Sequence, residues 1–221
     1  MRCFERLLEQ ANNELVQQAR LDGGVAVGYT CYYLPEPLLN CDKAFSVRLR
    51  APNTGSLDIS QYYMSSFICG YARALFERAF EGGFNFLDFY ASSDTCQQMV
   101  RVVENIHELK LIDHPGFSYG IIDAPMKVSP HGKKLYAQQI QNQILDPLRE
   151  KYGVDVSDES IRKAVAEHNE LCAIFEEISA LRKADNPVIT PREFHILCLV
   201  SYACGFPPEG NCSIGRNDLY G

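Results

Sequence analysis

The sequence lacks three features that would each assign it to a broad class of protein. Residues 1–20 are charged and amphipathic, without the apolar core and small-residue cleavage site of a signal peptide. The longest apolar run, at 196–206, is too short to cross a bilayer. The net charge is −7, and no basic stripe for nucleic acid is visible. We therefore expect a soluble, cytoplasmic protein that binds neither a membrane nor nucleic acid.

A compact Cys-x-x-Cys motif is also missing, although the chain contains nine cysteines. A secreted disulfide framework is disfavoured because no signal peptide is present and the count is odd. In a reducing compartment, cysteines serve as buried apolar residues, metal ligands or catalytic thiols. The count alone does not separate these three roles.

Apolar runs alternate with helical patterns between residues 24 and 125. Strands are expected at 25–30, 44–49, 84–90 and 119–124, and helices at 3–20, 60–81 and 96–109, with a brief helix or turn at 35–40. Gly82 and Gly83 are expected to end the second long helix. This alternation predicts an α/β fold with a three-layer, Rossmann/flavodoxin-like parallel sheet.

The pattern changes after Pro130, where three helices are expected at 131–151, 158–183 and 190–203 and no strand is expected. We accordingly divide the chain into an N-terminal helix (1–22), an α/β domain (23–130), a helical segment (131–204) and an irregular tail (205–221).

Two cysteines follow predicted strands and should lie at the edge of the sheet where ligands bind. Cys31 follows the first strand and Cys96 the third, near the start of a helix that would stabilise a thiolate. Cys69 is expected inside the preceding helix, with Gly70 beside it to permit close approach of a bulky group. By spacing alone, the three could meet at one site or could be small buried core residues.

The sequences around these cysteines resemble the 2-hydroxyacyl-CoA dehydratase family, which includes the benzoyl-CoA reductase subunits. The matching segments are Gly-Tyr-Thr-Cys-Tyr-Tyr-Leu-Pro-Glu at 28–36, Ile-Cys-Gly-Tyr-Ala-Arg at 68–73 and Asp-Phe-Tyr-Ala-Ser-Ser-Asp-Thr-Cys-Gln-Gln at 88–98. Ile-Asp-Ala-Pro at 122–125 resembles a Pro-containing strand end of the family, and the helices at 136–149, 153–169 and 187–193 follow in the family's order.

The resemblance implies an oxygen-sensitive [4Fe–4S] cluster within the α/β domain at 23–130. Cys69 and Cys96 match the family's cluster cysteines, and Cys31 matches a less uniform position beside the cluster. It also implies an acyl-CoA substrate, a second family subunit in a hetero- or homodimer, and an ATP-dependent activator that supplies one electron. The expected reaction is lyase chemistry, the radical elimination of water from a 2-hydroxyacyl-CoA thioester.

Alternatives within the resemblance are a benzoyl-CoA reductase-like subunit and a double-cubane cluster reductase subunit. A third alternative is a non-catalytic remnant that only binds a partner. Members of the family are longer and carry a further cluster cysteine in a second α/β half. We expect that half to be missing here, with the tail at 205–221 as its start. Asn40-Cys41-Asp42 and Cys172 depart from the family's small-residue segment and expected Arg. We therefore expect a fragment, half of a split protein or a divergent paralogue, inactive alone.

Other residues have both a functional and a structural interpretation. Glu36 and Lys127 are candidates for substrate binding, Lys127 as part of a basic patch for CoA phosphates that equally suits a solvated helix start. Asp88, expected inside a strand, and Glu36 could orient the site or satisfy backbone donors. His107, His114 and His131 could act in acid–base chemistry or could simply be surface histidines. Cys198, Cys204 and Cys212 could form a loosely spaced metal site in the tail. Lys133 and Lys134 complete the basic patch.

Overall fold

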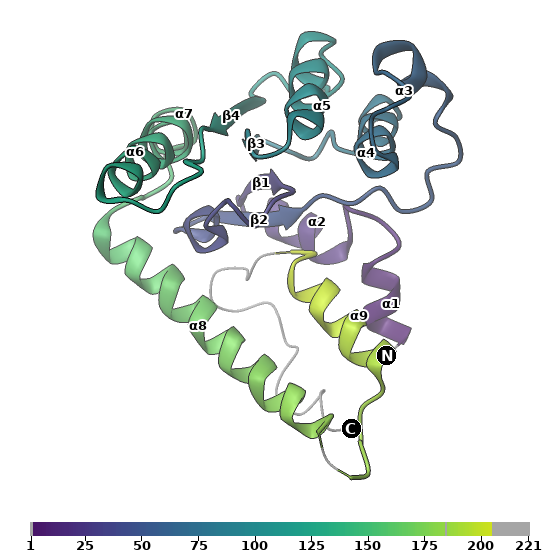
Figure 1. Cartoon of the computed structure of the whole chain (residues 1–221), viewed down its shortest axis with the longest axis vertical. Helices are drawn as coiled ribbons and strands as arrows, with labels where there is room; N and C mark the ends of the chain where they lie inside the picture. The colour runs from purple at the N-terminus through teal and green to yellow at the C-terminus, as the bar shows by residue number, and fades with distance from the viewer. Residues whose placement is uncertain (1, 184, 205–221) are drawn as a thin grey trace.

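A four-stranded parallel sheet forms the centre of the molecule (Figure 1). It is seen in a computed structural model that describes residues 2–183 and 185–204. The strands lie in the order β2-β1-β3-β4, with bounds β1 Val25–Tyr29, β2 Ala44–Arg48, β3 Phe89–Ser93 and β4 Ser118–Ile122. The predicted parallel α/β fold is confirmed.

Helices cover both faces of this sheet, so the domain has three layers. One core contains side chains of α2 (Glu14–Leu21), α4 (Gly70–Phe80) and α5 (Gln97–Glu108). The other contains side chains of α6 (Pro130–Ile140), the π-helical turn η2 (Gln141–Leu145) and α7 (Asp146–Tyr152). In β1, Ala26 points into the first core, and Val25, Val27 and Tyr29 point into the second. This alternation of faces is the period of two of a β-strand buried on both sides.

The helix predicted at 3–20 is in fact two helices, α1 (Arg2–Leu7) and α2. The break comes from Asn13, whose side-chain oxygen accepts hydrogen bonds from the Leu15 and Val16 N–H groups and caps α2. In a continuous helix these two N–H groups would bond to backbone carbonyl oxygens of the preceding turn. Here the Asn13 side chain accepts them instead, and a new helix starts. Its amide also donates to the Leu7 and Ala203 carbonyl oxygens, which links this break to the far end of the described chain.

The helix predicted at 60–81 is likewise two helices, α3 (Asp58–Tyr63) and α4. Buried Glu77 of α4 accepts hydrogen bonds from the Ile59 and Ser60 N–H groups, at 3.2 and 2.8 Å, and so supplies the N-terminal cap of α3. A residue of one helix thus fixes the start of the other. The predicted end of the second helix is confirmed, since α4 stops at Phe80 and Gly82 adopts φ +77°.

The third strand begins five residues later than predicted, at Phe89 instead of residue 84. Residues 84–87 form a turn closed by a hydrogen bond from the Leu87 N–H to the Phe84 carbonyl oxygen, and their large side chains fill the core. Asp88 therefore precedes β3 and does not lie inside a strand.

The chain after β4 is helical, as predicted. Its long helix α8 (Asp158–Leu181) packs against the 3₁₀ helix η1 (Glu36–Asn40), which connects β1 to β2 along the chain. α9 (Pro191–Ser201) returns beside α1, where Ile196 and Val200 pack on Leu7 (Figure 1). The predicted irregular tail at 205–221 lies outside the described residues. None of the described helices is both long enough and apolar enough to cross a membrane.

Gly120 of β4 permits the close approach of η2 to the sheet. A Cβ at this position would stand 1.9 Å from the Gln143 carbonyl oxygen, which no side chain can tolerate. The π-helical turn η2, an uncommon local geometry, therefore packs against a glycine, the residue type that has no side chain to obstruct it.

Candidate functional site

Three cysteine-bearing segments lie together at the carboxyl edge of the sheet. Cys31 follows β1, and its Sγ is 3.6 Å from the Thr95 Oγ1 in the loop after β3. The Cys69 N–H donates to the Gln98 Oε1 at 2.7 Å. Thr95 and Gln98 flank Cys96, so the segment of Cys96 contacts the segments of both other cysteines. Ligands of parallel α/β sheets bind at this edge.

Cys69 caps α4 and is not inside a helix, in contrast to the sequence prediction. Its Sγ accepts a hydrogen bond from the Ala72 N–H at 3.4 Å. The thiol is exposed at the start of the helix. The position thus offers a nucleophilic or metal-ligating sulfur to the solvent.

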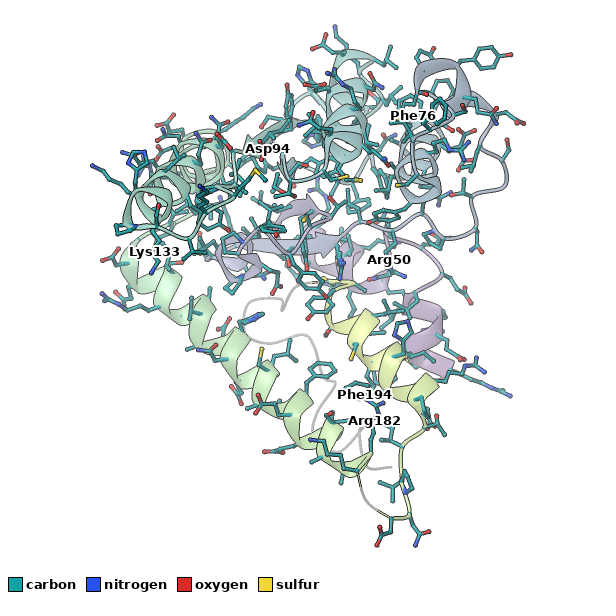
Figure 2. All side chains as sticks on the ribbon, viewed as in Figure 1. Arg50, Phe76, Asp94, Lys133, Arg182 and Phe194 are labelled. Atoms are coloured by element: carbon teal, nitrogen blue, oxygen red, sulfur yellow. The ribbon has the colours of Figure 1, made fainter. Side chains whose placement is uncertain are left out.

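Cys96 occupies the equivalent N-cap position of α5, and its thiol is also exposed. Its side chain makes no capping hydrogen bond, so the sulfur is not engaged by its own helix. The loop around it is held by Asp94 (Figure 2), whose carboxylate accepts a hydrogen bond from the Ala124 N–H at 3.1 Å. The loops after β3 and β4 are thereby joined at this edge.

Cys31 is half-buried and has a perturbed pKa. Burial alone would raise the pKa, but hydrogen bonds from the Tyr33 backbone and the Thr95 and Ser93 side chains outweigh it. With the positive charge of Arg48, they lower the pKa of the Cys31 thiol below its ordinary value. Of the three cysteines at this edge, Cys31 therefore has surroundings that favour the thiolate.

Three thiol sulfurs are the type of ligand that iron–sulfur clusters take. Among residues 2–183 and 185–204, no three His, Cys, Asp or Glu side chains converge closely enough for one ion. A [4Fe–4S] cluster is held differently, because each thiolate ligates a separate iron and the sulfurs stand further apart. Cys31, Cys69 and Cys96 would supply three soft ligands of the usual four.

Large apolar side chains are exposed around the cysteine edge. They belong to the segments that follow β1 and β4 and to the link before α4: Tyr32, Tyr33, Phe67, Met126 and Val128. Phe67 is 92% exposed although it lies two residues from Cys69. Exposed apolar groups gathered around one edge are typical of a surface that another molecule covers.

The two predicted substrate-binding residues have different surroundings. Lys127 is exposed in the loop after β4, on the cysteine edge, where an ammonium group can meet phosphate. The carboxylate of Glu36 is engaged by the chain itself, through Asn40 Nδ2 at 2.8 Å, Ser46 Oγ at 3.0 Å and His168 Nδ1 at 2.9 Å. Sequence reasoning missed all three partners of Glu36, and the only local signal for His168 is its four-residue spacing from Cys172.

Asp88 lies at the opposite, amino edge of the sheet, and its role is structural. Its carboxylate accepts the Ala26 N–H at 2.7 Å and pairs with Arg20, while His114 Nε2 lies 3.4 Å away. The His107 ring packs at a tilt against Tyr119, with ring centroids 4.7 Å apart, and His131 is exposed at the start of α6. The structure thus places none of the three predicted histidines in contact with the cysteines described above.

The predicted tail metal site involves two described cysteines. Cys198 of α9 is half-buried, and burial raises the pKa of its thiol. Cys204 is buried in the first core, and Cys212 lies outside the described residues. The remaining lysines of the basic patch, Lys133 and Lys134, are exposed on α6 (Figure 2 labels Lys133).

Comparisons with known proteins give one family and one relative. The family model for the "2-hydroxyglutaryl-CoA dehydratase, D-component" matches residues 31–211. The "(R)-phenyllactyl-CoA dehydratase beta subunit" of Clostridium sporogenes is 20% identical over 199 residues, which cover 90% of this chain and 52% of that protein. The chain thus spans about half the length of the relative it matches.

Proposed function

This chain belongs to the 2-hydroxyglutaryl-CoA dehydratase D-component family, and on that premise we propose that it is the cluster-binding part of a 2-hydroxyacyl-CoA dehydratase. The observation that carries the proposal is the meeting of three cysteine segments at the carboxyl edge, through the contacts of Cys31 with Thr95 and of Cys69 with Gln98. Cys69, Cys96 and Cys31 would hold a [4Fe–4S] cluster there. When bound, such a cluster supplies one-electron chemistry.

The residues of this chain would orient and shield the site. Cys69 and Cys96 are exposed at the starts of two helices, and the hydrogen bonds to Cys31 favour its thiolate at the end of β1. The proposed substrate is a 2-hydroxyacyl-CoA thioester that loses water in a lyase reaction. Lys127, exposed on the same edge, would pair with a CoA phosphate.

We propose a second family subunit as the partner that covers the cysteine edge. The exposed apolar side chains around that edge, Phe67 and Met126 among them, support a cover of this kind. A fourth cluster ligand and the electron-supplying, ATP-dependent activator would come from outside the chain. The protein is therefore proposed to act in an assembly and not alone.

Anaerobic reconstitution of the full chain with ferrous iron and sulfide tests the cluster. We expect iron and acid-labile sulfide in similar amounts, and a broad thiolate-to-iron charge-transfer absorbance, both lost in Cys69→Ala and Cys96→Ala. Cys3→Ala is the matched control, because Cys3 is an exposed thiol on α1 and belongs to none of the three cysteine segments at the carboxyl edge. Failure of the unsubstituted chain to take up iron, or iron uptake unchanged in both variants, contradicts the proposal.

Turnover with a panel of thioesters tests the reaction class. The chain, a family partner subunit and an activator with ATP would be mixed with 2-hydroxyacyl-CoA and aryl-CoA substrates. Elimination of water from the 2-hydroxyacyl-CoA is the expected result. Ring reduction of the aryl-CoA without dehydration would instead assign the chain to the reductases.

A further inference from the structure

Three reactive side chains form a relay on α8 and η1 that the cluster site does not use. The Cys172 Sγ lies 3.5 Å from the His168 Nε2, and the His168 Nδ1 lies 2.9 Å from the Glu36 Oε2. His168 and Cys172 are four residues apart on α8, which places both on one face of the helix. The order thiol, imidazole, carboxylate is that of a nucleophile with a general base and a group that orients the base.

The carboxylate end of this relay is firmly held. The Glu36 Oε1 accepts hydrogen bonds from Asn40 Nδ2 and from Ser46 Oγ, and Ser46 is fully buried in β2. The other carboxylate oxygen of Glu36, Oε2, is therefore the one that contacts the His168 imidazole. A proton on the His168 Nδ1 shared with this carboxylate leaves the Nε2 lone pair directed at the thiol. The imidazole separates sulfur from carboxylate, so the three groups do not converge on one point as metal ligands would.

The thiol end of the relay is open to the solvent, in aromatic surroundings. Cys172 is exposed, while 29% of the His168 side chain is exposed and 13% of the Glu36 side chain. Tyr202 is an electrostatic neighbour of Cys172, and burial, the hydrogen bond and charge of Tyr32, and the charges of Glu36 and Cys172 raise its pKa to about 12. Tyr202 therefore keeps its phenol proton at neutral pH and can donate it in a hydrogen bond.

A buried hydroxyl without a partner lies in the same region. Tyr29 is 1% exposed, and its hydroxyl group has no hydrogen-bond partner among the described residues. Its electrostatic neighbours are Glu36, Arg48, Tyr202 and Tyr32. Buried polar groups are almost always hydrogen-bonded, and an ordered water would satisfy this hydroxyl as it would other buried atoms without a partner, such as Thr30 Oγ1.

We propose that Cys172 is a base-activated nucleophile that accepts an acyl group from a thioester. The choice of a thioester rests on the proposed function; the relay itself does not. His168 removes the proton from Cys172, and the sulfur attacks the thioester carbonyl carbon. The new carbon–sulfur bond to Cys172 forms as the bond to the CoA sulfur breaks, and His168 returns the proton to the leaving thiol. The products are an acyl-Cys172 thioester and free CoA, without change of oxidation state.

The test is acylation of the full chain by acetyl-CoA at pH 7, followed by peptide mapping with mass spectrometry. We expect a hydroxylamine-labile acetyl group on Cys172, formed at least tenfold faster than on Cys3, an exposed thiol without a hydrogen-bonded base among the described residues. His168→Ala should lower the Cys172 rate roughly ten- to hundredfold, and added imidazole should restore part of it. Rescue by imidazole distinguishes a base from a residue that only supports the packing of α8 on η1.

Two further variants keep the inference testable if His168→Ala unfolds. His168→Gln retains a hydrogen-bonding side chain of similar length but no base, and should be as slow as the alanine variant. Glu36→Gln removes the charge that orients and stabilises the imidazolium, and should give an intermediate rate. Equal acylation of Cys172 and Cys3, or a Cys172 rate that does not respond to His168, overturns the proposal.

The assay needs no iron and is performed before any reconstitution. Iron binding at Cys69 and Cys96 is measured separately by metal content. A chain that binds iron but is not acylated loses only this inference, whereas a chain that is acylated but takes up no iron loses only the proposed cluster. The two proposals can therefore fail independently.

Discussion

Replacement of Asp88 by alanine should destabilise the fold without changing the cysteine edge. Asp88 is 7% exposed, and its carboxylate serves three partners, which are the Ala26 N–H, the Arg20 guanidinium and the His114 ring. Its loss leaves one buried backbone donor unpaired, at about 1–3 kcal/mol. It also removes the partner of a cation that is 28% exposed, for which solvent screening reduces the cost to about 1 kcal/mol. We therefore expect a loss of about 3 kcal/mol.

Asp88→Asn separates the two contributions, because the amide oxygen can still accept the Ala26 N–H while the charge is gone. It should cost about 1–2 kcal/mol, less than the alanine variant. Glu104→Gln is the control, since the Arg101–Glu104 pair is a surface pair at 2.7 Å on α5 and its loss should cost under about 0.5 kcal/mol.

Urea unfolding followed by circular dichroism measures these differences. With a slope of about 2 kcal/mol/M, Asp88→Ala should lower the midpoint by roughly 1.5 M. Alkylation of Cys31 in the folded variant should proceed at the wild-type rate, because Cys31 and Asp88 lie at opposite edges of the sheet. An alanine variant within 1 kcal/mol of the wild type would refute the reasoning, as would a loss equal to that of Glu104→Gln.

Three further predictions concern the packing and the buried groups. Gly120→Ala should destabilise the protein by about 3 kcal/mol in the same assay, because the added methyl group meets the Gln143 carbonyl oxygen. A neutral result would show that η2 can move away from the sheet. Glu77→Ala should cost about 2 kcal/mol and increase amide hydrogen exchange in α3, whose first N–H groups lose their acceptor, and unchanged exchange there would contradict this. Burial raises the pKa of the Cys41 thiol to about 11, so its neutral form is favoured in the folded state. Iodoacetamide at pH 9 should therefore leave Cys41 unmodified in the folded chain and modify it in urea, and rapid modification of the folded chain would contradict the assigned burial.

The alternation of apolar runs and helical patterns was sufficient to predict the parallel α/β sheet and the placement of Cys31 and Cys96 after strands. Both follow from local periodicity, and strands of a parallel sheet end at one edge whatever the rest of the chain does. Cys69 shows the limit of this reasoning. Its helix pattern extended through residues 60–81, but the chain leaves the helix after Tyr63 and starts another at Gly70, with Glu77 of the second helix capping the start of the first.

The elements that only the tertiary structure decided depend on contacts between distant parts of the chain. Asn13 bonds the Ala203 carbonyl oxygen, and Glu36 bonds His168 on a helix that follows the whole sheet. Neither contact has a local signature, because a hydrogen bond depends on position in space and not on separation along the chain. The sequence by itself therefore determined the fold class and the edge at which the cysteines gather. The relay from Glu36 through His168 to Cys172 exists only because the packing of α8 on η1 brings these side chains within hydrogen-bonding distance.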